Sequence, residues 1–368
     1  MKRKTSRHLL MTTDAVGGVW QYSTELAETL AAHGYRTTLA LLGPPPSPAQ
    51  REQAARIPEG ELIVTGLPLD WLSDSARHVE RAGSELAALA RRIGADLVHC
   101  NSPACVGAAA WPVPVVTAAH GCMATWWGAV RRTPLEPSFH WHRDMVRDGL
   151  LKADAVIAPS RSFAASLRDT YALRSTPLPV LNGRRRSQVH ASREPATTAL
   201  TVGRMWDEAK NGAVLDRAAA LARTPIQAAG PLRGPHGEEF VLAHLVPLGE
   251  VGEQDMTRLV SERPVFVSAA TFEPFGLAVL EAAQAGCALV LSDIATFREL
   301  WDGAAVFVDP HDAAGYAEAV DRLVDHPAER EELGRRAATR ALRYTPEACA
   351  AATAAVYDAV LADQEVAA

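Results

Sequence analysis

Short and almost entirely apolar runs recur along the chain, and longer amphipathic stretches separate them. In the first half these runs include HLLMTT, RTTLALLG, DLVHC, PVVTAAHG and DAVIAPS. Strands that are apolar on both faces are typical of a parallel sheet with helices on both sides. The second half repeats the style with ALTVGR, PIQAAG, PVFVSAA, ALVLSD and AVFVDP. The pattern therefore predicts an α/β chain with two doubly wound, Rossmann-like sheets.

A polar, basic and turn-rich stretch separates the two halves within residues 178–198. With 368 residues, the chain is too long for one ordinary domain and suits two. We predict an N-terminal domain over residues 1–180, a C-terminal domain over 181–345, and a final alanine-rich packing helix over 346–368. Two such domains would face each other across a cleft, and ligands of such sheets bind beyond the carboxyl ends of the strands.

Charge and composition exclude several classes of protein. The net charge of −6 argues against a nucleic-acid partner, and the basic start MKRKTSRHLL lacks the apolar core of a signal peptide. Residues 97–130 hold no Asp, Glu, Lys or Arg, but prolines and polar residues interrupt them too often for a membrane-spanning helix. We expect two buried strands there, with a helix between them. Membrane contact would be peripheral at most.

Cysteine and histidine usage indicates a reducing compartment and predicts no metal. The five cysteines form no metal-type pair spacing, and their odd number suits the cytoplasm. A few of these side chains could gather at neighbouring strand ends, but no regular ligand spacing supports a metal ion there: His99, Cys100, His120 and Cys122.

The segment FEPFGLAVLEAAQAG follows a buried strand and contains a helix start. Pro274 suits the first helical position, and Glu273 is expected outside the helix because a residue before proline avoids the helical region. Phe275, Gly276 and Leu277 would offer backbone N–H groups to an anion, which the helix dipole also favours.

A second acid, Glu281, lies in the same segment, four residues beyond Leu277 and hence on the same helix face. A phosphate at the helix start, with Glu281 on a ribose and Glu273 on a sugar, describes a bound nucleotide sugar. The alternative is that Glu281 is a salt-bridged helix acid and Glu273 a loop acid.

Two cations follow another strand in TVGRMWDEAKN. Asp207 is a plausible N-cap of the next helix, which places Lys210 in the first turn, where the helix dipole disfavours a cation. A nearby anion would compensate. Arg204 and Lys210 could both reach a diphosphate and stabilise its charge as it leaves. The alternative is a pair of surface cations.

The N-terminal half offers a glycine pair and a histidine. Gly17 and Gly18 lie between the first strand and the first helix, where they let a loop pass close to a ligand, although they do not form the dinucleotide fingerprint. His120 ends another strand and is either a packed residue or a functional one. The sequence has no Asp-x-Asp for a divalent metal and no P-loop, so Arg204 and Lys210 would do electrostatically what Mg²⁺ does elsewhere.

Taken together, these motifs resemble the retaining glycosyltransferases of the GT-B fold, specifically glycosyltransferase family 4. EPFGLAVLE resembles the family's E-x7-E signature, GRMWDEAK its Arg-x5-Lys pair, DAVGGVW its glycine loop and VLNG its interdomain linker. The motifs occur in order over nearly the whole chain. One departure is the run Arg184, Arg185 and Arg186 after the linker, where the family has an apolar residue and an acid.

The resemblance implies roles for these residues. Arg204 and Lys210 would bind the donor diphosphate, Glu281 the ribose, and Glu273 with the backbone of residues 275–277 the sugar and its phosphate. Gly17 and Gly18 would approach the phosphates or the acceptor, and His120 would lie near the transferred sugar. It also implies transfer with retention, without a metal or another cofactor, and a last helix that crosses back onto the N-terminal domain.

The expected function is therefore transfer of a sugar from a nucleoside-diphosphate sugar to a sugar or other hydroxyl acceptor. UDP is the expected nucleotide, with GDP or ADP as alternatives. Two other functions remain open at this point. A nucleotide-sugar 2-epimerase shares the architecture, and a non-catalytic nucleotide-sugar-binding protein could descend from an enzyme. The acceptor is not readable from the sequence.

Overall fold

The computed structural model describes residues 6–107, 109–187, 192 and 194–367. The chain divides into two compact units. Unit 1 comprises Met1–Arg184 together with Pro346–Ala368, and unit 2 comprises Arg185–Thr345. The chain leaves unit 1 within the polar stretch of residues 178–198 and returns to it for its last helix, so the crossing back that the resemblance implied is confirmed.

In the part of unit 1 that the structure describes, a seven-stranded parallel sheet has the strand order β3-β2-β1-β4-β5-β6-β7. The chain adds β2 and β3 on one side of β1 and then adds β4 to β7 on the other side. The switch point of this doubly wound sheet therefore lies between β1 and β4. The strands are β1 (Arg7–Asp14), β2 (Tyr35–Leu42), β3 (Glu61–Val64), β4 (Leu97–Cys100), β5 (Val115–Ala118), β6 (Ala155–Ala158) and β7 (Leu178–Pro179).

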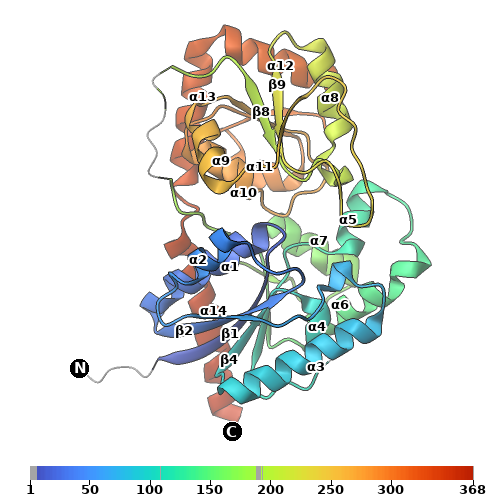
Figure 1. Cartoon of the computed structure of the whole chain (residues 1–368), viewed down its shortest axis with the longest axis vertical. Helices are drawn as coiled ribbons and strands as arrows, with labels where there is room; N and C mark the ends of the chain where they lie inside the picture. Colours follow the sequence, from blue (N-terminus) through green and yellow to red (C-terminus); the bar gives the residue numbers. More distant parts are fainter. Residues whose placement is uncertain (1–5, 108, 188–191, 193, 368) are drawn as a thin grey trace. The chain divides into compact units, whose positions relative to one another are not determined.

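Helices cover both faces of this sheet (Figure 1), which explains why its central strands β4 and β5 are buried throughout. They are α1 (Gly18–Leu30), α2 (Pro48–Ala54), α3 (Ala76–Ile93), α4 (Pro103–Gly107), α5 (Met123–Val130), α6 (His140–Lys152), α7 (Arg161–Tyr171) and α14 (Pro346–Ala367), with the 3₁₀ turns η1 (Ala31–His33), η2 (Asp70–Leu72) and η3 (Pro137–Phe139). The apolar segment of residues 97–130 forms β4, α4 and β5 as predicted, and α5 as well.

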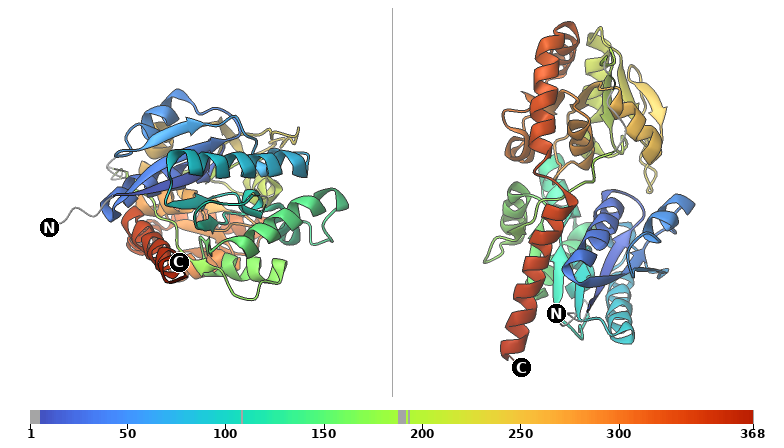
Figure 2. Two further views of the ribbon diagram at one scale, coloured as in Figure 1. Left: turned by 90° about the horizontal axis from the view of Figure 1, so that it is seen from below. Right: turned by 90° about the vertical axis from the view of Figure 1, so that its left-hand side faces the viewer.

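The last helix, α14, lies along unit 1 (Figure 2) and packs against α1. Its inward side chains belong to the same core as the residues of the sheet and of α1; they are Cys349, Ala350, Ala354, Tyr357 and Val360. Tyr357 is fully buried, stacks edge-on against Tyr35 at 5.3 Å, and hydrogen-bonds through its hydroxyl to His99 Nδ1 at 2.6 Å. The alanine-rich tail is therefore a structural part of unit 1.

Unit 2 repeats the architecture. Within its described residues, a six-stranded parallel sheet has the order β10-β9-β8-β11-β12-β13, with its switch point between β8 and β11. The strands are β8 (Ala199–Val202), β9 (Ile226–Ala229), β10 (Val246–Gly249), β11 (Val265–Ser268), β12 (Leu289–Ser292) and β13 (Val306–Val308). The helices are α8 (Gly212–Leu221), α9 (Glu253–Ser261), α10 (Leu277–Gln284), α11 (Ala295–Trp301), α12 (Ala313–Asp325) and α13 (Pro327–Ala341), with the 3₁₀ turn η4 (Glu208–Lys210).

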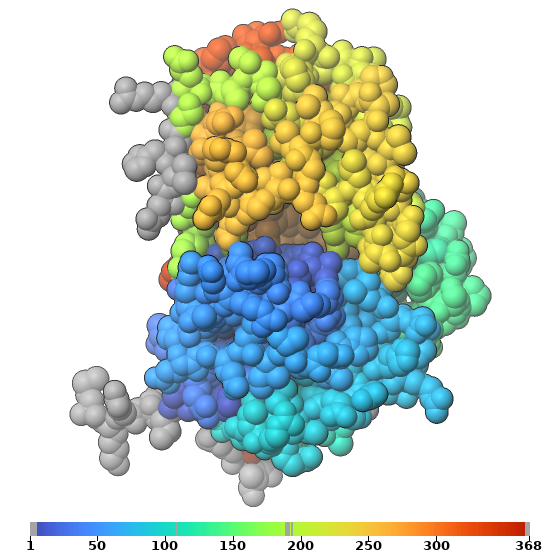
Figure 3. All heavy atoms as spheres, viewed as in Figure 1, coloured from blue at the N-terminus to red at the C-terminus, as the bar shows by residue number. Residues whose placement is uncertain are grey.

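The two sheets are the doubly wound, Rossmann-like sheets that the sequence predicts. The segment between β9 and β10 (yellow in Figure 3) lies at the surface of unit 2, and most of its side chains are exposed. Among the described residues, no helix combines the length and the apolar character that crossing a membrane requires.

Candidate active site

In unit 2, the candidate donor residues follow β8 and β11, the two strands on either side of the switch point. Arg204 and Lys210 come after β8, and Glu273 comes after β11. Lys210 Nζ lies 2.6 Å from Glu273 Oε2, and these side chains are 23% and 16% exposed. The structure thus brings together two residues that lie 63 positions apart in the sequence. Glu273 is outside the helix as predicted, but it is already paired with Lys210.

The turn that carries Lys210 is tied to the loop that carries Glu273. The Asn211 side-chain amide donates to the carbonyl of Ala269 at 3.0 Å and to that of Pro310 at 2.6 Å. The Thr271 N–H also donates to the carbonyl of Ala209 at 2.9 Å. Asn211 adopts a left-handed conformation (φ +56°), which asparagine tolerates better than most residues. The sequence analysis missed Asn211; its only local signal is an asparagine before a helical pattern.

Arg204 is held from two sides. Its Nη2 lies 3.2 Å from Asp207 Oδ2, and its guanidinium lies 5.3 Å from the centre of the Trp206 ring. The Asp207 carboxylate is buried and also accepts from the Ala209 N–H at 3.0 Å. The Arg204 side chain nevertheless remains 40% exposed, so its donors are accessible to a ligand.

The helix that the sequence predicts at Asp207 is only the 3₁₀ turn η4, and the α-helix begins at Gly212. Asp207 does cap η4 through the Ala209 N–H. Lys210 therefore ends a 3₁₀ turn and does not lie in the first turn of an α-helix. Its compensating anion in this structure is the Glu273 carboxylate.

The start of α10 also differs from the prediction. The helix begins at Leu277, three residues after Pro274, and Gly276 is its N-cap with φ +90°. A side chain at Gly276 would be strained by that φ, and its Cβ would lie 3.2 Å from Phe297 Cε1. Phe275 is buried and packs edge-on against Tyr344 at 5.7 Å, so its side chain anchors the loop. The first N–H groups of α10 have no partner within the helix, as at any helix start.

Glu281 occupies the less buried face of α10. Leu277, Glu281 and Gln284 are partly exposed, whereas Leu280 and Ala282 are buried. The predicted shared face of Leu277 and Glu281 is therefore confirmed. This face carries the only carboxylate of α10 itself, one turn into the helix.

A further glycine makes the close approach of strand ends possible in unit 2. Gly230 follows β9 with φ +134°, and a Cβ on it would lie 1.9 Å from the carbonyl oxygen of Gly203. Gly203 in turn lies against the aliphatic stem of Lys210. No larger residue fits at Gly230 without moving the segment that carries Arg204. Sequence reasoning missed this position because the contact is between separate strands.

In unit 1, the glycine pair lies at the start of α1, which follows β1. Gly17 is the N-cap of α1 with extended backbone, and a Cβ added to it would meet nothing within 4 Å. Neither backbone conformation nor packing within unit 1 therefore demands glycine at this position. A ligand that approaches the backbone closely at Gly17 would require glycine there.

His120 follows β5 and contacts the residue after β4. Its Nε2 lies 2.8 Å from Asn101 Oδ1, and its ring lies 4.4 Å from the Tyr22 ring, edge-on. The Asn101 amide nitrogen donates to the carbonyl of Thr12 at 2.6 Å and to Ser23 Oγ at 3.2 Å. This orientation makes Asn101 Oδ1 the acceptor, so His120 donates from Nε2 and keeps a lone pair on Nδ1.

His99 and His120, whose rings both contact Asn101, form a histidine cluster, and both are neutral at physiological pH. Removal from water, with a smaller contribution from the neighbouring His99, lowers the pKa of His120 to about 3. Burial lowers the pKa of His99 to about 4. His120 can therefore accept or donate a hydrogen bond, but it is not a cationic acid at neutral pH.

Of the three arginines that follow the linker, one is buried and two are exposed. Arg184 is buried in unit 1, where its Nη1 donates to Glu25 Oε1 of α1 at 2.7 Å, whereas Arg185 and Arg186 are exposed. Among the described residues, no group of three or more His, Cys, Asp or Glu side chains is arranged to hold a metal ion.

Comparison with known proteins decides the family. Residues 16–182 match the model of Glycosyltransferase Family 4, and residues 196–326 match that of Glycosyl transferases group 1. The chain belongs to glycosyltransferase family 4. It is therefore a glycosyltransferase that takes its sugar from a nucleotide-sugar donor, and the transferase function is favoured over the epimerase and binding-protein alternatives.

Curated relatives are similar over different shares of the chain. A glycogen synthase of Mycobacterium tuberculosis (strain ATCC 25618 / H37Rv) is 26% identical in an alignment 386 positions long, gaps included, which covers 93% of this chain and 91% of the relative. A D-inositol 3-phosphate glycosyltransferase of Arthrobacter sp. (strain FB24) is 32% identical over 127 residues, 34% of this chain and 30% of the relative.

Solved structures share the fold. A sucrose-phosphate synthase from Thermosynechococcus elongatus superposes with a TM-score of 0.79 at 18% identity, over 97% of this chain and all of that one. HepE of Anabaena, solved with UDP and glucose, gives 0.73 at 14% identity, over 96% of this chain and all of that one. These likenesses confirm the GT-B fold.

Proposed function

We propose that this glycosyltransferase transfers a sugar from a UDP-sugar, with retention at the anomeric carbon and without a metal ion. The observation that carries the proposal is the Lys210–Glu273 pair, 2.6 Å apart at the switch point of the unit 2 sheet. Ligands of doubly wound sheets bind at this point. Arg204 and the start of α10 are on the loops that follow the same two strands.

The donor diphosphate would bind to Arg204, Lys210 and the first N–H groups of α10. Each of these groups favours an anion, and the guanidinium group of an arginine can donate two parallel hydrogen bonds to phosphate oxygens. Because Lys210 is paired with Glu273 in this structure, an arriving diphosphate would draw the ammonium away from the carboxylate. Glu273 would then be available to accept hydrogen bonds from the sugar hydroxyls.

Glu281 would bind the ribose hydroxyls, since it lies on the accessible face of α10 one turn beyond Leu277. A carboxylate there can accept from both hydroxyls of a ribose, whereas the phosphates remain at the helix start, where the dipole favours them. Gly276 would allow the donor to approach the backbone closely. In unit 1, Gly17 and Gly18 would allow the phosphates or the acceptor to approach the start of α1 closely.

In the chemical step, the bond between the anomeric carbon and the diphosphate oxygen breaks, and a bond to the acceptor oxygen forms on the same face of the sugar. The acceptor hydroxyl passes its proton to the departing diphosphate oxygen. Arg204 and Lys210 would stabilise the negative charge that grows on the diphosphate, which is the task that a divalent metal performs in other enzymes. Neutral His120 would hold a sugar hydroxyl through Nδ1. The acceptor is unidentified.

UDP is the proposed nucleotide because HepE, which shares the fold, is solved with UDP and glucose. The test is the thermal midpoint of the protein with UDP, GDP and ADP added separately. A nucleotide at about 100 times its Kd stabilises the native state by about 2.7 kcal/mol, which shifts the midpoint by a few degrees. A shift with UDP alone supports the proposal, whereas a shift with GDP or ADP alone refutes the choice of base. No shift with any nucleotide refutes the proposed donor site.

Retention and metal independence need their own measurement. Hydrolysis of a UDP-sugar, or transfer from it, would be followed by NMR of the anomeric proton, with and without EDTA. Retained configuration and an unchanged rate in EDTA are the expected results. Inverted configuration, or activity that EDTA abolishes and Mg²⁺ restores, would overturn this part of the proposal.

A further inference from the structure

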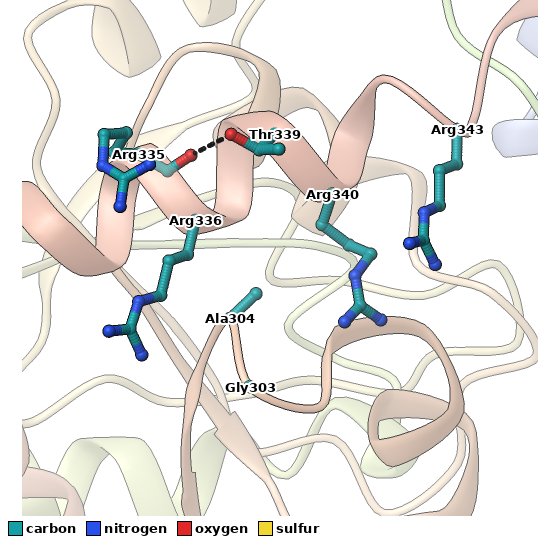
Figure 4. Close-up of a pocket in the computed structure, with 7 residues that line it drawn as sticks. All are labelled: Gly303, Ala304, Arg335, Arg336, Thr339, Arg340 and Arg343. Carbon is teal, nitrogen blue, oxygen red and sulfur yellow. Dashed lines mark hydrogen bonds between the residues drawn. The ribbon is translucent and has the colours of Figure 1, made fainter.

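A basic stripe runs along α13 and the turn that follows it, and none of its residues is among those of the candidate donor site. Arg335, Arg336, Arg340 and Arg343, with Thr339, line a cavity of about 290 Å³ against the loop at Gly303 and Ala304. Glu332, Arg335, Arg336, Thr339 and Arg340 follow the spacing i, i+3, i+4, i+7 and i+8 that places side chains on one face of α13, and Arg343 lies two residues beyond the end of the helix at Ala341. Figure 4 shows Arg336 and Arg340 extending from the helix toward that loop, and Arg343 extending from the segment that follows the helix.

Carboxylates do not neutralise this stripe. Glu332 accepts from both Arg335, at 2.7 Å, and Arg336, also at 2.7 Å. Among the residues that the structure describes, no carboxylate forms an ion pair with Arg340 or Arg343. Four guanidinium groups thus share one carboxylate. The whole chain carries a net charge of −6, so the local excess of positive charge does not follow from overall composition.

The floor of the cavity is fixed by one of the arginines. Arg340 donates to the carbonyl of Leu300 at 3.3 Å and to that of Asp302 at 2.8 Å, and so caps the carboxyl end of α11. The loop then turns at Gly303, which has φ +75°. The Asp302 carboxylate itself lies 3.5 Å from Arg298. Arg336 and Arg343 therefore line a cavity whose opposite wall, the loop at Gly303, is fixed in place by Arg340.

We propose that this cavity, the α13 arginine pocket, binds a compact anion that carries one or two phosphate groups. A guanidinium group can donate two hydrogen bonds to phosphate oxygens at once. Four guanidinium groups that share one carboxylate therefore favour the binding of an anion. A volume of about 290 Å³ lies at the small end of ligand pockets, which suits a phosphate ester or a lipid headgroup better than a nucleotide sugar. None of the pocket residues belongs to the candidate donor site.

The first experiment is calorimetric titration of the full chain with inorganic pyrophosphate. All proteins carry Lys210→Met, which weakens binding of pyrophosphate at the candidate donor site. Arg336→Gln with Arg343→Gln removes two pocket charges and leaves the Arg340 cap intact. The matched control, Arg233→Gln with Arg258→Gln, removes two charges from exposed arginines elsewhere in unit 2. Circular dichroism and the thermal midpoint check that each variant is folded.

The expected result is one pyrophosphate per chain, with a Kd that rises at least about tenfold in the pocket variant and not in the control. The Kd should also rise with salt, because the interaction is between accessible charges. Equal Kd values in the pocket variant and the control, or no binding at low salt, would overturn the proposal. The readout does not depend on transferase activity, so it stands or fails separately from the proposed function.

A second arm distinguishes the source of the phosphate. Phosphatidylcholine vesicles with and without phosphatidylglycerol are pelleted with the Lys210→Met protein and with its pocket variant. Binding that needs phosphatidylglycerol and is lost in the pocket variant assigns the site to a lipid headgroup. Pyrophosphate binding without vesicle binding assigns it to a free phosphate compound. Vesicle binding that the pocket variant retains in full would contradict a headgroup site in this pocket.

Discussion

At the scale of single residues, Lys210 is the side chain on which the proposed donor site depends most. Lys210→Met keeps the aliphatic stem that lies against Gly203 but removes the ammonium next to Glu273. We expect the rate of transfer to fall by about 10²- to 10³-fold, because a preorganised charge near the leaving group is lost. The thermal midpoint should fall as well, because Glu273 is only 16% exposed and loses its counter-charge, so circular dichroism checks that the variant is folded. Steady-state kinetics and calorimetric UDP binding check this, and Arg258→Gln is the charge-matched control. Unchanged kinetics would remove Lys210 from the site.

The histidine cluster of unit 1 makes a second prediction at this scale. His99 and His120 have pKa values of about 4 and about 3 in the folded protein, against about 6.5 when unfolded. Between these values the unfolded chain binds more protons than the native one, so the free energy of unfolding falls as pH drops below about 6.5. Urea unfolding at pH 7, 6 and 5 should show this loss of stability. The loss should be smaller in His120→Asn, which has one such histidine fewer, and an unaltered pH dependence would contradict the assignment.

At the scale of elements, Asn211 connects η4 and α8 to the loop after β11. Asn211→Ala removes two hydrogen bonds and places a residue that disfavours φ +56° at a left-handed position. Asn211→Gly removes the same bonds but tolerates the backbone. Loss of the bonds should cost about 1–3 kcal/mol of unfolding free energy in both variants, with about 1 kcal/mol more in the alanine variant. Equal stability of all three proteins by urea unfolding would show that the tie is unimportant.

The elements themselves were largely predictable, and the contacts between their ends were not. The apolar runs located the strands except β10, whose residues VPLG form no apolar run, and the acids Glu273 and Glu281 marked the helix that follows β11. The start of that helix was placed at Pro274, because proline suits a first turn; the left-handed Gly276 delays it to Leu277. Asn211 escaped prediction because its partners are 58 and 99 positions away. No local pattern reports such distant contacts.

At the scale of the whole molecule, unit 1 depends on residues from both ends of the chain. Its core combines α14 with α1 and the sheet, and Tyr357 bonds the buried His99. Residues 1–184 alone would expose this core face and leave His99 without its partner. Replacing a single buried aromatic residue by alanine costs about 3–5 kcal/mol, and the loss of the whole helix should cost more. A chain of residues 1–184 should therefore lack a cooperative unfolding transition.

Restoring α14 without unit 2 should restore that transition. The backbone at Gly183 hydrogen-bonds with Cys349, so the two crossing points of the chain are close, and a short Gly/Ser linker can join Arg184 to Pro346. We expect this joined unit 1 to unfold cooperatively in urea and, with Tyr357→Phe, to lose only the stability of the His99 hydrogen bond, about 0.5–1.5 kcal/mol. Tyr357→Ala should be far less stable. Cooperative unfolding of residues 1–184 without α14 would show that the helix covers unit 1 but is not needed to build it.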